Sequence, residues 1–313
     1  MAGKLVTIFG GSGFIGRYVV QRLAARGDRV RVAVRRPNEA LFLKPLGDVG
    51  QVKPVACNIR NADSVAQAVA GADAVINLVG VLHNSGKQTF DALHAVAPGV
   101  IAAAAQDAGA TTLTHVSAIG ASAESAAAYA QTKAQGETAL RDGFSQATIL
   151  RPSLVIGPED GFFNRFAKLA KMLPILMVPG TETRFQPVCV TDVADAVVRA
   201  VDGGKGVAGQ TFELGGPQIY TFRQMLKLMM DHMGVHRPIV RMPSGLASLS
   251  GMMMGLLPNP QLTLDQVRQL QTDNIVSDGA KTFKHLGITP DPISSLLPKY
   301  MVQYRPKGQF SKI

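Results

Sequence analysis

The stretch LVTIFGGSGFIG, residues 5–16, decides the fold of this chain. Its apolar first part, Leu5–Phe9, predicts a strand, and Gly10, Gly13 and Gly16 follow at every third position. Glycine is needed where a tight turn demands backbone angles that side chains resist, and where the main chain must approach a pyrophosphate closely. The pattern therefore predicts a strand, a phosphate-binding turn and a helix whose first N–H groups face the phosphates of a dinucleotide.

Apolar, β-branched runs and alanine-rich segments of helical length alternate through the first half of the chain. This alternation predicts an α/β fold, a Rossmann-type doubly wound parallel sheet covered by helices on both faces. The rhythm breaks after residue 158, so we expect a dinucleotide-binding domain over 1–158 and a smaller C-terminal α/β lobe over 159–313, with segments near 185–216 returning to the Rossmann core. The expected strands, after the first, are 29–34, 52–56, 74–79, 112–117 and 147–150, and the expected helices are 14–25, 64–70, 90–107 and 126–141.

Composition narrows the class of protein. The 313 residues are 46% hydrophobic and 17% charged, which fits a large folded α/β unit and excludes global disorder. The two cysteines, Cys57 and Cys189, form no CxxC pair, so the sequence indicates a reducing compartment without a disulfide framework or a zinc site. No metal ligands are predicted.

The charge balance points to anionic partners. Lys and Arg outnumber Asp and Glu by 32 to 22, a net charge of +10, which favours dinucleotide phosphates, lipid head groups or acidic protein surfaces. Nucleic acid is not expected, because no basic run exceeds Arg35-Arg36 and no motif interleaves aromatic and basic residues. The longest apolar stretches, around 172–178 and 246–257, are too short and interrupted to span a bilayer, so we expect no transmembrane segment. A first strand starting by Leu5 leaves no room for a signal peptide, and we expect a bacterial cytoplasmic protein.

The end of the second expected strand bears on cofactor choice. An acidic residue there binds the ribose hydroxyls of NAD, whereas an arginine favours the extra phosphate of NADP. This chain has Arg35 and Arg36 and no carboxylate before Glu39. We therefore expect NADP(H) rather than NAD(H), the alternative being that both arginines are solvated loop residues.

Tyr129 and Lys133, in YAQTK, are four residues apart on an expected helix and so share one of its faces. An ammonium beside a phenol favours the phenolate and prepares it for proton transfer to or from a substrate oxygen. A surface Tyr–Lys pair without function is the alternative. The position of the pair, between two strands whose ends should face the nicotinamide, favours the functional interpretation.

Together these motifs resemble the extended short-chain dehydrogenase/reductase superfamily, of the NAD-dependent epimerase/dehydratase type, over most of residues 4–220. GGSGFIG is similar to its nucleotide-binding loop, Tyr129 with Lys133 to its YxxxK motif, and LRPSLVIGP, VTDVADA and FELGG to three later motifs. The resemblance implies an adenine contact at Asn58-Ile59 and an adenosine ribose contact in the segment 77–80. The residues expected to bind the cofactor are Gly10, Ser12, Gly13, Phe14, Ile15, Gly16, Arg35, Arg36, Asn58, Ile59, Leu78, Val79, Gly80, Ser117, Tyr129, Lys133 and Pro152.

The catalytic serine of this superfamily poses a question of register. The resemblance places a Ser or Thr at the end of the fifth strand, where our register puts Ala118, with Ser117 one residue earlier. Alternation along a strand points Ser117 the other way, unless a bulge or a shifted register brings it into place. Ser122 is a weaker candidate.

The segments 184–201 and 262–291 resemble an atypical branch that contains the nucleotide-binding accessory subunit of respiratory complex I, and the branch is also similar to proteins connected with ubiquinone synthesis. The resemblance implies tight NADPH binding near a membrane without demonstrated turnover. Our first hypothesis is an NADP(H)-binding accessory or assembly subunit of complex I, peripheral on the cytoplasmic face of the inner membrane (the matrix side in a mitochondrion). Its partners are complex I subunits, with anionic lipid or quinone as further partners.

The alternative hypothesis is an active NADP(H)-dependent reductase, epimerase or dehydratase linked to quinone metabolism. There Tyr129 acts as the general acid/base, Lys133 tunes it and holds the nicotinamide ribose, and Ser117 polarises the substrate carbonyl. The residues alone do not fix a substrate or an oligomeric state.

A methionine- and leucine-rich segment, 245–257, has helical spacing and is open to three interpretations. It packs on its own lobe, contacts a partner subunit, or lies on anionic lipid.

Four other polar residues are given structural roles. His232 and His236 are four apart, but Gly234 lies between them without a third ligand nearby, so we predict no metal site. We expect His115 to be a hydrogen-bonded interior residue of its strand, and Arg151 to join the two lobes.

Overall fold

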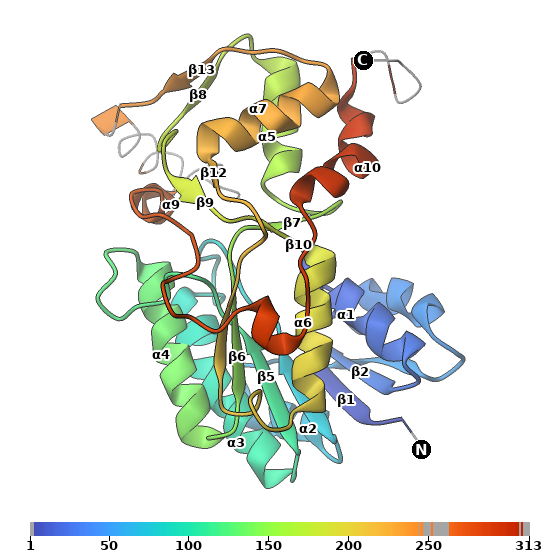
Figure 1. Ribbon diagram of the computed structural model, residues 1–313. Helices are drawn as coiled ribbons and strands as arrows, with labels where there is room; N and C mark the ends of the chain where they lie inside the picture. The colour runs from blue at the N-terminus through green and yellow to red at the C-terminus, as the bar shows by residue number, and fades with distance from the viewer. Residues whose placement is uncertain (1–2, 244, 247–251, 253–262, 307, 309–313) are drawn as a thin grey trace. The chain divides into compact units, whose positions relative to one another are not determined.

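The computed structural model describes residues 3–243, 245–246, 252, 263–306 and 308 of the chain (Figure 1). The chain forms two compact units, each assembled from three separate segments. Unit 1 comprises Met1–Pro152, Thr191–Leu214 and Gly279–Thr289, and unit 2 comprises Ser153–Val190, Gly215–Asp278 and Pro290–Ile313. The two domains expected from the sequence, 1–158 and 159–313 with segments near 185–216 returning to the first, stay a prediction.

Unit 1 is built on a seven-stranded parallel sheet, which confirms the expected doubly wound α/β fold. Ile8 and Phe9, which point to opposite faces of an interior strand, are both fully buried, as expected for a sheet covered on both faces. The sheet has the order β11-β6-β5-β4-β1-β2-β3. Its strands are β1 (Leu5–Phe9), β2 (Arg29–Val34), β3 (Val52–Ala56), β4 (Ala74–Asn77), β5 (Thr112–Val116), β6 (Thr148–Pro152) and β11 (Thr211–Leu214).

Helices connect these strands, and one of them is irregular where the sequence predicts a single helix over 90–107. The chain there forms a π-helical turn, η2 (Asp91–Val96), before α3 (Ala97–Asp107). Pro98 has no N–H to donate to the carbonyl of His94, so the regular hydrogen-bond ladder cannot run through this point. The other helical segments of unit 1 are α1 (Phe14–Ala25), η1 (Pro37–Leu46), α2 (Ala62–Val69), α4 (Ala128–Gly143), α6 (Val190–Asp202) and η3 (Phe283–Leu286).

Helix α4 lies unusually close to η2 and α3, and glycines make the approach possible. A Cβ atom on Gly136 would overlap the carbonyl oxygen of His94, and one on Gly143 would lie 2.9 Å from the side chain of Ala102. Gly99 on α3 leaves similar room for Ala139 on α4. The backbones of the two helical segments therefore meet without intervening side chains, which fixes α4 along its length.

Late segments of the chain complete unit 1. The N–H of Glu213 in β11 donates to the carbonyl of Lys281 at 2.8 Å, and the Lys281 ammonium donates to Gln210 at 2.7 Å. The edge of the sheet at β11 is thus covered by a segment from much later in the chain, since Lys281 lies 71 residues after Gln210.

Unit 2 holds a second hydrophobic core, rich in phenylalanine and methionine. Phe162, Phe166 and Phe222 pack with ring centroids 5.1 to 5.3 Å apart, and buried methionines of α7 fill the space beside them. Three two-stranded sheets flank this core: β7 (Val155–Ile156) with β10 (Val188–Cys189), β8 (Leu176–Val178) with β13 (Ile239–Arg241), and β9 (Arg184–Phe185) with β12 (Tyr220–Thr221). The helical segments are α5 (Phe163–Met172), α7 (Phe222–Met233), α9 (Leu264–Gln269), η4 (Ile293–Ser295), α10 (Leu297–Met301) and η5 (Val302–Tyr304).

The C-terminal segment is tied into the core of unit 2 by a buried hydrogen bond. The Tyr300 hydroxyl donates to the Asp160 carboxylate at 2.6 Å, and the carboxylate also accepts the backbone N–H groups of Gly157 and Phe163. These bonds satisfy a carboxylate that is 2% exposed, whose pKa is nevertheless raised, mainly by burial.

No helix in the described part of the chain is long and apolar enough to cross a membrane. The methionine-rich segment 245–257 lies outside the described residues except for Gly245, Leu246 and Met252.

The close contact at Gly136 gives a first prediction. Gly136→Ala is expected to lower the free energy of unfolding by about 3 kcal/mol, because a methyl group there overlaps backbone that cannot move aside cheaply. Chemical denaturation followed by circular dichroism measures it. Gly161→Ala is the matched control, since a Cβ there meets no atom within 4 Å and the effect should stay below about 0.5 kcal/mol. Equal losses for the two variants would contradict the packing.

Candidate functional site

The turn between β1 and α1 lies where the strand order of the sheet reverses. β1 pairs with β2 on one side and with β4 on the other, and ligands of open α/β sheets bind at the carboxyl ends of strands at such a point. Gly10 has φ +79°, and a Cβ there would lie 3.1 Å from the carbonyl carbon of Leu78 after β4. A Cβ on Gly16 would overlap the Gly10 carbonyl. The turn is therefore a close-fitting backbone cradle that only glycine allows.

The amino end of α1 offers unpaired donors beside this cradle. Gly13 occupies the N-cap position without a capping side chain, and no acidic residue lies in the first turn. The first N–H groups of the helix, from Phe14 and Ile15 onward, suit the phosphates of a dinucleotide in both charge and geometry. Ser12, half-buried in the turn, is the hydroxyl of this loop.

The two arginines after β2 differ in their surroundings. Arg36 pairs with Glu39 at 2.9 Å, and this hydrogen bond raises the pKa of Arg36. Arg35 is exposed, and among the described residues no carboxylate pairs with it. Of these two guanidinium groups, only that of Arg36 has a carboxylate partner among the described residues.

The loops after β3 and β4 hold the remaining expected cofactor contacts. Asn58 is exposed, and its side-chain oxygen accepts the N–H of Arg60 at 3.2 Å, which shapes the loop that carries Ile59. Asn77 at the end of β4 is fully buried and accepts the N–H of Val79 at 3.1 Å. Leu78, Val79 and Gly80 follow it along the same edge as Gly10.

Tyr129 and Lys133 lie on one face of α4, as the sequence predicts. The Lys133 ammonium is 6.0 Å from the centroid of the Tyr129 ring. It donates a hydrogen bond to the carbonyl of Val116, the last residue of β5, at 3.3 Å. A Cβ added to Gly80 would lie 3.5 Å from the same ammonium. The Tyr129–Lys133 pair on α4 therefore lies next to the loop that follows β4.

Two rings complete the surroundings of Tyr129. Phe90 and His94 stack with centroids 5.4 Å apart, and each meets the Tyr129 ring edge-on, at 5.8 and 5.3 Å. His94 accepts the N–H of Val81 through Nε2 at 3.0 Å, so its proton is on Nδ1. The histidine consequently joins the loop after β4 to the ring of Tyr129.

Burial sets the electrostatics of this cluster. It lowers the pKa of Lys133 to about 8, against the opposing attraction of Glu137 one helical turn away. It lowers the pKa of His94 to about 3, helped by repulsion from Lys133, and that of His115 well below its usual value. At neutral pH the cluster therefore holds one cation, Lys133, beside two neutral imidazoles.

Several buried polar atoms near Lys133 have no hydrogen-bond partner among the described residues. Both ring nitrogens of His115 are in this group, so the expectation that this histidine is hydrogen-bonded through its side chain is wrong. The hydroxyl of Ser117, just after β5, is also buried and unpaired, as is Nδ2 of Asn77. Unsatisfied donors and acceptors at the carboxyl ends of β4 and β5 fit a region that receives a polar ligand or ordered water. Pro152 ends the neighbouring strand β6.

Arg151 has a different role from the expected lobe contact. Its guanidinium binds both oxygens of Glu137, at 2.9 and 2.6 Å, and lies 3.6 Å from Glu213, which are two residues of the same unit. The pair with Glu137 is bidentate and raises the pKa of Arg151. This network ties α4 to β6 and β11 beneath the Tyr129–Lys133 pair.

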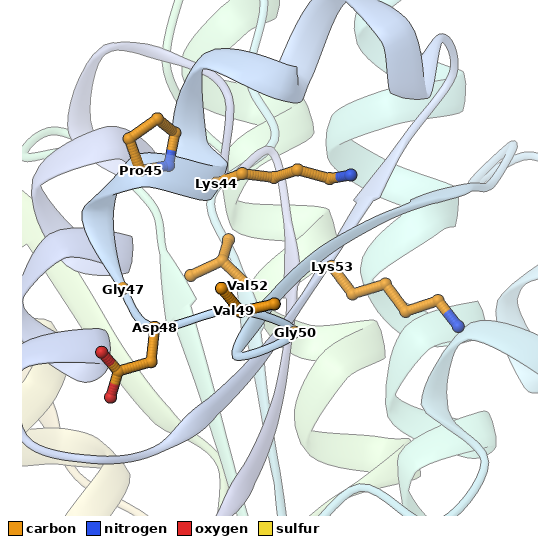
Figure 2. Close-up of a pocket in the computed structure, with 8 residues that line it drawn as sticks. All are labelled: Lys44, Pro45, Gly47, Asp48, Val49, Gly50, Val52 and Lys53. Atoms are coloured by element: carbon orange, nitrogen blue, oxygen red, sulfur yellow. The ribbon is translucent and has the colours of Figure 1, made fainter.

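A hollow of about 550 Å³ elsewhere in unit 1 does not belong to this site (Figure 2). Its residues precede or begin β3, at the amino end of that strand, whereas the glycine turn and Lys133 are at carboxyl ends. It is lined by Lys44, Pro45, Gly47, Asp48, Val49, Gly50, Val52 and Lys53. No cluster of residues able to hold a metal ion occurs within the described residues.

Residues 6–215 match the model of the NAD dependent epimerase/dehydratase family, which spans the whole glycine turn and the Tyr129–Lys133 pair. The chain belongs to this family. Epimerase/dehydratase family members bind a nicotinamide dinucleotide, and the glycine cradle, the free helix N-terminus and the unpaired polar atoms around Lys133 fit such a ligand.

Two curated relatives match almost all of the chain. One is subunit 9 of the NADH dehydrogenase (ubiquinone) 1 alpha subcomplex, mitochondrial, of Arabidopsis thaliana, 35% identical over 98% of this chain and 80% of that protein. The other is the mitochondrial NADH-ubiquinone oxidoreductase 40 kDa subunit of Neurospora crassa, 31% identical over 99% and 82%. The crystal structure of the NADPH-dependent quinone oxidoreductase of Escherichia coli with NADPH has a TM-score of 0.74 at 17% identity, over 94% of this chain and 99% of that one, which shows the same fold.

His94 and Phe90, which contact Tyr129, are members of the site that sequence reasoning missed. A single histidine in an alanine-rich segment has no motif around it, and its role follows from the π-helical turn and from the contact with α4. The nearest signal in the sequence is Pro98, four residues later, which interrupts the helix there.

The neutral state of His94 gives a prediction about pH. The folded chain keeps this imidazole neutral down to about pH 3, whereas the unfolded chain protonates it below about pH 6.5. The unfolded state therefore binds more protons in this window, and stability falls as the pH falls. Between pH 7 and pH 5, His94→Asn is expected to lose about 2 kcal/mol less unfolding free energy than the wild type.

Denaturant unfolding at the two pH values measures this difference, and comparing each variant with itself removes any change in baseline stability. His236→Asn, at an exposed histidine, is the control and should lose as much as the wild type. An identical acid loss in all three proteins would show that His94 is not buried in its neutral form.

Proposed function

We propose that this protein is an NADP(H)-binding accessory or assembly subunit of NADH:ubiquinone oxidoreductase, respiratory complex I. The observation that carries the proposal is the match to subunits of that enzyme at 35% and 31% identity over nearly the whole chain. In this role the dinucleotide is mainly a structural ligand. A ligand that binds only the folded state, at about a hundred times its Kd, stabilises that state by about 2.7 kcal/mol.

The surroundings of the two loop arginines support NADP(H) over NAD(H). Arg35 is exposed after β2 and Arg36 is held by Glu39, so Arg35 is the residue that we assign to the 2′-phosphate. A guanidinium fork binds a phosphate through paired, charge-assisted hydrogen bonds.

The rest of the dinucleotide follows the carboxyl edge of the sheet in this proposal. The turn from Gly10 to Gly16 and the N–H groups of α1 hold the pyrophosphate, and Asn58-Ile59 contact the adenine. Tyr129 and Lys133 hold the nicotinamide ribose, and Leu78 to Gly80 contact the adenosine ribose. Lys133, still largely charged at neutral pH, supplies donors to the ribose hydroxyls.

The proposed location is peripheral, on the cytoplasmic face of a bacterial inner membrane or the matrix side of a mitochondrial one. The relatives are named as mitochondrial subunits of a ubiquinone-reducing enzyme, which supports a site of action beside a quinone-containing membrane.

The geometry around Tyr129 favours one alternative, an NADP(H)-dependent reductase, epimerase or dehydratase acting on a quinone-like or other carbonyl substrate. Tyr129 would pass a proton to the substrate oxygen, Lys133 would stabilise the resulting phenolate from the same helix face, and Ser117 would donate to that oxygen. The bound dinucleotide supplies hydride chemistry in such a site. The two neutral histidines keep further positive charge away from the cluster.

Gentle purification from the native host, with mass spectrometry of bound nucleotide and co-purifying proteins, separates the two functions. We expect bound NADPH together with complex I subunits. A protein that exchanges NADP(H) freely and recovers no respiratory subunits from solubilised membranes contradicts the accessory role.

Substituting Tyr129 separates the two functions a second time. Tyr129→Phe removes one hydroxyl, so the accessory role predicts unchanged recovery of complex I subunits and a change in NADPH affinity below about tenfold. A substrate-dependent oxidation of NADPH that the wild type performs and Tyr129→Phe lacks would instead establish the enzymatic alternative.

Arg35 gives a prediction about cofactor choice. Arg35→Ala is expected to weaken NADPH binding roughly 10- to 100-fold and to leave NADH binding unchanged, because a hydrogen bond to a charged group is lost. Isothermal titration of both dinucleotides checks this. Arg36→Ala should have the smaller effect because its guanidinium is already paired. Equal loss of NADPH and NADH in Arg35→Ala would refute the assignment.

A further inference from the structure

Unit 2 exposes a group of apolar side chains that its own core does not cover. We call this group the apolar patch, and it consists of Met172, Leu173, Ile175, Met177 and Val240, which are 79%, 42%, 48%, 52% and 41% exposed. Its members come from the end of α5, the following loop, β8 and β13, which lie next to one another within unit 2 (Figure 1). Single exposed apolar residues need no explanation, but five adjoining ones mark a surface that meets something apolar.

The backbone forces this patch outward. In β8 the flanking residues Leu176 and Val178 are 1% and 3% exposed, so alternation along the strand turns Met177 away from the core. Val240 pairs in register with Met177 and therefore lies on the same outer face of the two-stranded sheet. Rotating either side chain inward would require moving the whole strand by one residue.

The loop before β8 is similarly fixed. The N–H of Leu173 donates to the carbonyl of Leu169 at 2.8 Å and closes α5, and the N–H of Leu176 donates to the carbonyl of Pro238 at 2.9 Å. Between these two anchors, residues 173–175 are all exposed. The apolar side chains of this loop are held at the surface by hydrogen bonds on both sides.

Positive charge surrounds the patch. The segments 161–181 and 232–264 contain no Asp or Glu, whereas the first holds three Lys or Arg residues and the second holds two. Lys168, Lys171 and Arg241 are exposed, and Arg237 donates to the carbonyl of Ala170 at 3.1 Å at the end of α5. Glu182, just beyond the first segment, is paired with Arg223 and is also attracted by Arg241, so a carboxylate does lie beside the cations of the two segments.

We propose that the apolar patch inserts shallowly into the interface of a lipid bilayer that contains anionic headgroups, with Lys168, Lys171 and Arg241 contacting those headgroups. The inference rests on the peripheral membrane location in the proposed function. It identifies the protein surface and the class of lipid that would account for that location. Protruding methionine and isoleucine side chains enter the acyl boundary, while the cations around them remain at headgroup depth.

The chemistry of the surface favours lipid over a protein partner. A protein interface usually offers both signs of charge and neutral hydrogen-bonding groups around its apolar centre. The two segments that carry this patch offer cations and apolar side chains without a single carboxylate, which matches a surface of phosphate groups over hydrocarbon.

Vesicle flotation of the purified full-length protein tests the proposal. We expect binding to vesicles of phosphatidylcholine with phosphatidylglycerol, and much weaker binding to phosphatidylcholine alone. The double variant Ile175→Glu/Met177→Glu should lose at least about tenfold in vesicle affinity, because two exposed apolar groups become charged without any change in the core. Leu41→Glu/Val49→Glu, which adds the same two charges at exposed apolar residues of unit 1, is the matched control and should bind as the wild type does.

A second variant separates charge from apolar insertion. Lys168→Gln/Lys171→Gln is expected to weaken binding to the anionic vesicles roughly 30-fold at low salt, and to leave binding to neutral vesicles unchanged. Circular dichroism checks that each variant is folded, and NADPH binding should not change in the variants of Lys168, Lys171, Ile175 and Met177, because these residues lie outside unit 1.

The outcomes distinguish this inference from the proposed function. Failure of the wild type to float with anionic vesicles overturns the lipid surface, and complex I subunits recovered with the protein would still support the accessory role. Loss of those subunits in Ile175→Glu/Met177→Glu, without any vesicle binding by the wild type, would make the patch a protein interface and overturn the inference too. Flotation that depends on the patch and on anionic lipid supports it.

Discussion

The close contact between the backbone of α4 and the carbonyl of His94 is the constraint on which the candidate site depends. Gly136 leaves no side chain between the two segments, so α4 lies near enough for Tyr129 and Lys133 to meet Phe90 and His94. The same closeness removes water from Lys133, and the loss of water rather than any neighbouring charge lowers its pKa. Packing thus determines the electrostatics of the cluster.

The ion pairs of Arg151 with Glu137 and Glu213 also hold α4 in place. Glu137 binds Arg151 through both of its oxygens. It also lies one helical turn from Lys133, and its negative charge raises the pKa of that ammonium, against the effect of burial. A buried pair of this kind contributes little net stability, because desolvation offsets most of its attraction. Its effect is on position and charge: it orients α4 against β6 and β11, and it favours the charged form of Lys133 beside Tyr129.

The sequence predicts the parts of this structure that depend on local pattern. Glycines at fixed spacing after an apolar run specify the turn of Gly10 to Gly16, and alternation of strands and helices specifies the sheet. What it did not predict depends on contacts between distant segments: the π-helical turn that places His94, the unpaired ring of His115, and the partners of Arg151. None of these leaves a pattern in its own neighbourhood, because each partner lies elsewhere in the chain.

The division of each unit into three chain segments has a consequence for synthesis on the ribosome. The edge strand β11 receives its backbone partner from Lys281, and Asp160 receives its hydroxyl partner from Tyr300, so unit 1 is incomplete until residue 281 has been made and unit 2 until residue 300 has been made. A chain made at about 5–20 residues per second carries an open sheet edge and an exposed methionine-rich core for many seconds before its last residues emerge. The nascent protein therefore has its greatest need of chaperones late in translation, well after the nucleotide-binding turn has formed.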